Sequence, residues 1–176
     1  LLGLGDPYDY QKRIEAGISN NEYLWDMSLY KGKYYLYWGA LPAVLLFPMS
    51  NNILLYLSDG WLVLFFVSGL FFYLALLSYK IWKKNNQKMP PWMLGVFILA
   101  LGVSPPMLWM LGKPRVYEVA IAGSQFFFVG GIYWIYLGLI KNKFETRELL
   151  LVSIHWSLAL ATRITVLPVV SFGVLV

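Results

Sequence analysis

The chain has 176 residues, of which 59% are hydrophobic, 18% aromatic and only 13% charged. Soluble globular domains carry about a quarter of charged residues, so this composition excludes an ordinary soluble domain and indicates a membrane protein. The net charge of +5 does not indicate nucleic-acid binding, because the basic residues fall at the ends of apolar runs, where they anchor and orient membrane helices. The absence of cysteine excludes disulfides and thiolate metal sites.

The chain opens on an acidic segment behind a short apolar start. Residues 1–4 are expected to end a first transmembrane helix, which makes the chain a fragment, and residues 5–58 are expected to form an external loop. In the segment GDPYDY, Asp6 suits a helix N-cap, Pro7 the first helical position and Asp9 the positive end of the helix. A role in helix capping explains the two acids as well as a catalytic or cation-binding role does. A carboxylate just outside a bilayer can also take a proton from a hydroxyl or hold a divalent cation.

The rest of the loop combines a hairpin signal with proline-broken apolar runs. Alternation around a Lys-Gly-Lys turn predicts a small hairpin over about residues 28–36, which contains Tyr35. Its tyrosines suit a headgroup-level aromatic belt or sugar stacking equally well. Between residues 34 and 58, Pro42 and Pro48 interrupt the apolar sequence, which favours amphipathic interfacial helices over one clean span.

Three long uncharged runs follow in residues 59–176. Residues 60–79, 89–112 and 119–140 provide 20, 24 and 22 uncharged residues. At about 1.5 Å per residue, each can cross a hydrocarbon core of about 30 Å. The second run should bend near its end at Pro105. The predicted fold is therefore all-α, a polytopic transmembrane helix bundle with an external loop that carries the interfacial helices and the hairpin.

The basic residues give this bundle an orientation. The connector from Lys80 to Lys88 carries four lysines and is read as a short loop, and residues 141–147 carry three more basic residues. By the positive-inside rule both face the cytoplasm, which places residues 5–33 and the turn at 112–118 outside.

Charged residues at the predicted external ends are candidate binding groups. Arg163 should lie about 24 Å beyond Arg147, where the last helix bends, and it could grip a phosphate or simply snorkel to the interface. Glu118 could bond a sugar, orient Arg115 or serve only as a helix N-terminal acid. His155 is expected to be a neutral histidine bonded to a neighbouring helix.

The acidic motif after a first membrane helix, followed by interfacial helices and short-looped spans, resembles the GT-C superfamily of membrane glycosyltransferases. The segment DPYDYQ is similar to the acidic motif in the first external loop of oligosaccharyltransferase catalytic subunits. The run SLYKGKYYLYWGALPAVLLFP resembles a stretch in uncharacterised bacterial relatives of protein mannosyltransferases and lipid A aminoarabinose transferases. The mannosyltransferase motif usually has adjacent acids, whereas the two acids here are three residues apart.

The resemblance implies an inverting transferase in the bacterial plasma membrane, with its active site outside. It implies a polyprenyl- or dolichyl-phosphate sugar as donor and an unknown hydroxyl as acceptor. Asp6 takes the position of the catalytic base, with Asp9 as second choice, and a divalent cation, Mg²⁺ or Mn²⁺, stays open. Substrate-binding roles fall to the following residues: Arg115, Glu118, Arg163, Tyr10 and Tyr35. A transporter and a non-catalytic assembly subunit are the alternatives.

Overall fold

The structure, a computed structural model, describes residues 11, 15, 27–30, 33–36, 39–85 and 90–175. The chain divides into two compact units, Leu1–Tyr37 and Trp38–Val176. Each is described by itself.

The described part of the first unit contains the hairpin that the sequence predicts. Strands β1 (Met27–Tyr30) and β2 (Lys33–Leu36) pair antiparallel, and Ser28 lies opposite Tyr35. Only two residues separate the strands, which is the shortest common hairpin connection. The acidic segment and most of the helix predicted behind it lie outside the described residues.

The second unit begins with two short helices, α2 (Leu41–Leu46) and α3 (Asn51–Leu54). The sequence predicts helices here because the prolines forbid one long span, and α2 indeed starts with Pro42 in its first turn, where no backbone N–H is needed. Both helices belong with the bundle rather than with the hairpin unit. Their interfacial position remains a prediction.

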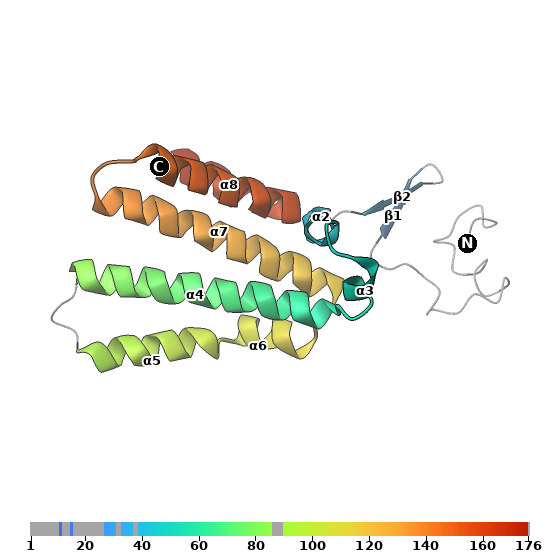
Figure 1. The fold of residues 1–176 in the computed structure, drawn as a ribbon, viewed down its shortest axis with the longest axis horizontal. Coiled ribbons are helices and arrows are strands. Elements are labelled where there is room, and N and C mark those ends of the chain that lie inside the picture. Colours follow the sequence, from blue (N-terminus) through green and yellow to red (C-terminus); the bar gives the residue numbers. More distant parts are fainter. Residues whose placement is uncertain are drawn as a thin grey trace. The chain divides into compact units, whose positions relative to one another are not determined.

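Each of the three charge-free runs forms helix, as predicted (Figure 1). Helices α4 (Asp59–Asn85) and α7 (Val116–Ile140) are long and apolar enough to cross a membrane. The pair α5 (Pro91–Gly102) and α6 (Pro105–Gly112) makes a third candidate span if it is counted as one, bent by 41°. At the bend Ser104 is extended, since the residue before a proline is pushed out of the helical region.

One expectation about α4 is wrong. The lysine-rich connector was expected to be a loop from Lys80, but α4 continues through Lys84 to Asn85. Lysine is a good helix former, and its positive charge near a helix C-terminus is favourable to the helix dipole. The charges therefore lengthen the helix instead of ending it.

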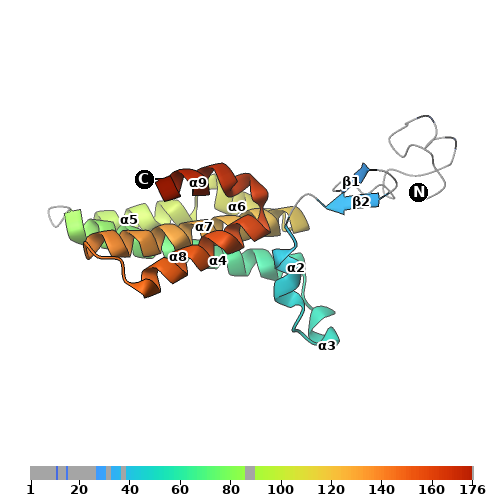
Figure 2. The ribbon, with the colours of Figure 1, turned by 90° about the horizontal axis from the view of Figure 1, so that it is seen from above.

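Helix α8 (Thr146–Thr162) packs along α7 and ends where the sequence predicts a bend (Figures 1 and 2). Arg163 is extended, and the chain continues through a 3₁₀ turn, η2 (Ile164–Val166), into α9 (Leu167–Leu175). Pro168 cannot sit inside a continuous helix, but it is tolerated in the first turn of α9. Thus α8 ends directly before Arg163, and α9 starts at Leu167, directly before the proline.

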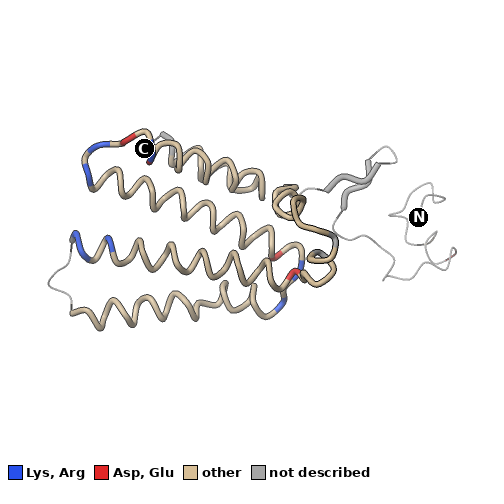
Figure 3. The backbone as a smooth tube through the Cα atoms, in the orientation of Figure 1, with Lys and Arg blue, Asp and Glu red and all other residues tan. Residues whose placement is uncertain are grey.

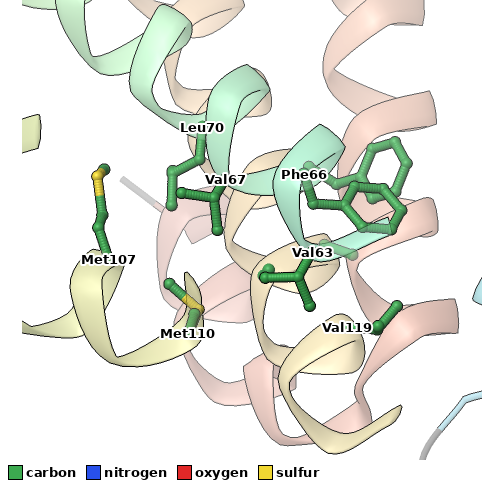
Figure 4. Packing of buried hydrophobic residues seen from close by; sticks show 10 residues of the cluster. Val63, Phe66, Val67, Leu70, Met107, Met110 and Val119 are labelled. Carbon is green, nitrogen blue, oxygen red and sulfur yellow. The ribbon is translucent and has the colours of Figure 1, made fainter. Parts of the chain in front are cut away.

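The buried core joins α4, α6, α7 and α8 (Figure 4). Val63, Phe66 and Leu70 of α4 face Met107 and Met110 of α6 on one side and Val119 of α7 on another. Glycines of α7 lie in close contact with side chains of α8. A Cβ at Gly130 would overlap the His155 ring, and a Cβ at Gly131 would overlap the Trp156 indole. Small residues at these positions let α7 and α8 approach closely.

Candidate functional site

The described charged residues of the second unit gather at the two ends of its helices (Figure 3). One end carries the lysines of α4 together with Lys141 and Arg147 beside the α7–α8 turn, and the other carries Asp59 and Glu118 in the first turns of α4 and α7, Lys113 and Arg115 before α7, and Arg163, which contacts Tyr117. This follows from the up-and-down course of the chain, because α4 and α7 both start at the second end and α8 finishes there. We call the second end the arginine end.

Arg163 occupies the break between α8 and η2 at the arginine end. Its guanidinium lies 4.8 Å from the centre of the Tyr117 ring, and Nη2 donates a hydrogen bond of 3.0 Å to the Tyr117 hydroxyl. A guanidinium has five N–H donors, and this is its one hydrogen bond to a side chain among the described residues. The tyrosine therefore orients a cation that keeps donors for a ligand, in the fork geometry that suits phosphate or carboxylate.

The backbone around Arg163 is fixed by a contact with the segment before α2. The Gly39 N–H donates a hydrogen bond of 3.0 Å to the carbonyl of Thr162, one of the carbonyls that the end of α8 leaves without a helical partner. A Cβ at Gly39 would overlap the carbonyl oxygen of Ala161, so only glycine allows this approach. The position of Arg163 is thus set by two parts of the chain more than 100 residues apart in sequence.

Glu118 is the second notable group at this end. Its side chain is 8% exposed, and its Oε2 atom is buried with no hydrogen-bond partner among the described residues. Buried carboxylate oxygens are normally hydrogen-bonded, so such an atom calls for a water, an ion or a ligand group. Arg115 precedes α7 directly and is exposed, and the described residues show no ion pair between it and Glu118. The predicted role of Glu118 in orienting Arg115 has no contact to support it.

The remaining candidate residues are not joined to this site by the structure. Asp6, Asp9 and Tyr10 lie outside the described residues. Tyr35 is placed in β2, which belongs to the first unit, and its side chain is not described. Their roles remain predictions. Within the described ranges, no group of three His, Asp or Glu side chains could hold a metal ion.

His155 lies deeper in the bundle and forms a bridge between helices. Its Nδ1 is 2.8 Å from the Leu151 carbonyl oxygen, and its Nε2 is 2.9 Å from the Tyr73 hydroxyl of α4. A carbonyl can only accept, so Nδ1 donates to Leu151, and Nε2 shares a hydrogen bond with the Tyr73 hydroxyl. The expectation of a histidine bonded to a neighbouring helix is confirmed, and this histidine joins α8 to α4.

At the opposite end, Lys141 and Glu148 form an ion pair across the α7–α8 turn. Lys141 Nζ donates a hydrogen bond of 2.7 Å to Glu148 Oε1, and the second carboxylate oxygen accepts from the Glu145 N–H at 3.1 Å. The hydrogen bond from Lys141 lowers the pKa of Glu148, and the same bond raises the pKa of Lys141. This turn is a structural element, because its charges satisfy one another.

Tyr117 and Gly39 were missed by the sequence reasoning. The placement of Arg163 near the start of α7 could have indicated Tyr117, because both residues are expected at the same level. Nothing in the sequence indicates that Gly39, in the segment before α2, donates a hydrogen bond to the end of α8.

Compared with models of known protein families, with curated proteins and with solved structures, the chain matches none.

Proposed function

We propose that this chain is part of a multi-pass membrane glycosyltransferase of the GT-C type, in the bacterial plasma membrane with its reactive side outside. The enzyme transfers a sugar from a polyprenyl- or dolichyl-phosphate donor to an acceptor hydroxyl. The observation that carries the proposal is Arg163, a cation held by Tyr117 at the break of α8, on the end of the bundle opposite the lysines. A lipid-linked phosphate needs a cation of this kind at the membrane surface.

The reaction assigns one role to each candidate residue. Asp6 or Asp9 takes the proton of the acceptor hydroxyl as general base, and the hydroxyl oxygen attacks the anomeric carbon. The bond between that carbon and the phosphate oxygen breaks with inversion, and the polyprenyl phosphate leaves. Arg163 and Arg115 stabilise the negative charge on the departing phosphate. No step requires a metal, although Mg²⁺ or Mn²⁺ bound by the acids fits the chemistry of carboxylates.

The remaining candidate residues would bind the sugar of the donor. Glu118 offers a carboxylate oxygen with no partner among the described residues, which would accept a hydrogen bond from a sugar hydroxyl. Tyr10 and Tyr35 would stack on the sugar ring.

The distribution of charge supports surface chemistry over passage through the bundle. In the described helices α4 to α7, charged side chains occur only in the first turn or in the last two turns. A transport path would place ionisable groups at mid-membrane depth. By the positive-inside rule, the positively charged residues at the lysine end favour a cytoplasmic position for that end, which supports an external position for the arginine end.

The test is donor turnover by the full-length protein in lipid nanodiscs. Release of polyprenyl phosphate is followed for a panel of polyprenyl-phosphate sugars with the wild type, Asp6→Asn, Asp9→Asn and the control Asp59→Asn. We expect one donor to be consumed, one of the first two variants to lose turnover, and Asp59→Asn to retain it, because Asp59 only begins α4. No turnover with any donor would favour a non-catalytic assembly subunit. Turnover that survives both substitutions would indicate that the acidic segment only caps a helix.

A further inference from the structure

Helices α4 and α5 enclose an apolar groove near the lysine end of the bundle. Its volume is about 710 Å³, within the range of about 300–1,000 Å³ that ligand pockets occupy. The lining is almost wholly aliphatic and aromatic, and its one hydroxyl, on Ser78, donates to the Leu74 carbonyl. The residues that form the two walls include Leu74, Leu77 and Ile81 of α4 and Met93, Phe97 and Ala100 of α5. The groove therefore suits a hydrocarbon chain.

The rim of the groove carries lysines. Lys84 follows Ile81 by three residues and Leu77 by seven, so it shares their side of α4 just beyond the apolar lining. Lys80 precedes Lys84 by one helical turn. Neither lysine forms an ion pair with another described residue, whereas Lys141 at the same end is paired with a glutamate. Among the described residues, no acid balances these two cations, and an anionic group would complement them.

The distance from the inner end of the groove to Lys84 matches the thickness of one leaflet of a bilayer. Leu74 lies ten residues from Lys84, which is about 15 Å along the helix axis. This is half of a hydrocarbon core of about 30 Å. Trp82 also lines the groove, and its ring lies 6.3 Å from that of Tyr79, at the level where aromatic residues mark the membrane interface. A headgroup at Lys84 would therefore place an acyl chain along the whole groove.

We propose that an anionic phospholipid of the cytoplasmic leaflet binds in this groove. Its acyl chain packs between α4 and α5, and its phosphate lies against Lys80 and Lys84. Basic pockets between membrane helices on the cytoplasmic side are typical sites for anionic headgroups. A helix from a partner would fill the apolar groove equally well, but it would leave the two lysines without a counter-charge. The inference rests on the proposed membrane insertion and is independent of glycosyl transfer.

The test uses the full-length protein in nanodiscs that contain traces of lipid with a photoactivatable acyl chain. Phosphatidylglycerol is compared with phosphatidylcholine, and the labelled peptides are mapped by mass spectrometry. We expect the anionic lipid to label the groove walls preferentially. Lys84→Gln should weaken its binding about fivefold, as expected for one lysine near a membrane surface. Ala100→Phe should reduce labelling of the groove walls, because the larger side chain occupies part of the groove.

Two matched variants separate a specific site from general effects. Lys143→Gln removes an exposed lysine from the α7–α8 turn at the same end of the bundle. Gly95→Phe adds a phenyl ring to α5, as Ala100→Phe does, at a position where an added Cβ would meet no atom within 4 Å. Both should label like the wild type. Equal labelling by the two lipids, labelling that Ala100→Phe leaves undiminished, crosslinks to a protein segment, or displacement by polyprenyl phosphate would each overturn the proposal. Sugar turnover is measured separately in the same nanodiscs, so loss of either function is seen independently of the other.

Discussion

Substitution of Gly131 by alanine should destabilise the pair of helices α7 and α8. A Cβ at this position overlaps the indole of Trp156, which is 6% exposed. The indole has little room to move, because its Nε1 donates to the Phe128 carbonyl at 3.3 Å, its ring stacks on Phe128 at 6.3 Å, and Gly173 of α9 lies against its far edge. The new methyl must therefore displace a side chain that is held on several sides.

The magnitude follows from opposing terms. Overpacking a filled core costs about 1–3 kcal/mol, and weakening the indole hydrogen bond adds about 0.5–1.5 kcal/mol. Alanine returns about 1 kcal/mol through its higher helix propensity. We expect a net loss of about 0.5–3.5 kcal/mol from the free energy of unfolding. Gly95→Ala is the matched control, since it makes the same change in α5 at a position where the added Cβ would meet no atom within 4 Å.

Thermal unfolding of the detergent-solubilised chain, followed by circular dichroism, measures both variants. At about 2–4 °C per kcal/mol for a chain of this size, Gly131→Ala should lower the melting temperature by several degrees. Gly95→Ala should leave it unchanged or raise it slightly. If the two variants melt at the same temperature, the close approach of α7 and α8 at Gly131 is not what holds these helices together.

Two further substitutions test polar contacts of the bundle. Tyr73→Phe removes the hydroxyl that pairs with the partly buried His155 ring, which should cost about 0.5–1.5 kcal/mol in the same unfolding assay. Tyr79→Phe, which keeps its ring contact with Trp82, should cost less, and equal losses would refute the bridge. Lys141 lowers the pKa of Glu148 below its usual 4.5, so this carboxylate stabilises the fold above pH 4.5 and the contribution is lost as pH falls through its lowered pKa. The melting temperature of Glu148→Gln should therefore depend less on pH between about 6 and 3 than that of the wild type, and parallel pH profiles would contradict this.

The helices were predictable because their signals are local. Charge-free runs long enough to cross a bilayer gave α4 and α7, and the proline pair at Pro105 gave the bend between α5 and α6. The end of α8 at Arg163 was predictable for the same reason, since Pro168 forbids a continuous helix. The end of α4 was misplaced because charge was taken as a sign of a loop, although lysine favours helix.

The site was only partly predictable because its contacts join distant parts of the chain. The charge pattern placed Arg163 at the correct end of the bundle, but the hydrogen bond to Tyr117 spans 46 residues. The contact of Gly39 with the end of α8 depends on how α2 returns to the bundle. The groove between α4 and α5 depends on the separation of two helices, which composition does not specify.

The binding of polyprenyl monophosphate to the full-length protein in nanodiscs tests the proposed function most directly, because this ligand is the predicted leaving group. Loss of a charge-assisted hydrogen bond costs about 1.5–3 kcal/mol, so Arg163→Gln should weaken the affinity about 10- to 150-fold. Arg147→Gln removes an exposed arginine at the opposite end, where its guanidinium lies 5.7 Å from the Trp134 ring, and it should bind like the wild type. An affinity that is unchanged in Arg163→Gln, or reduced equally in both variants, would contradict a phosphate site at the arginine end.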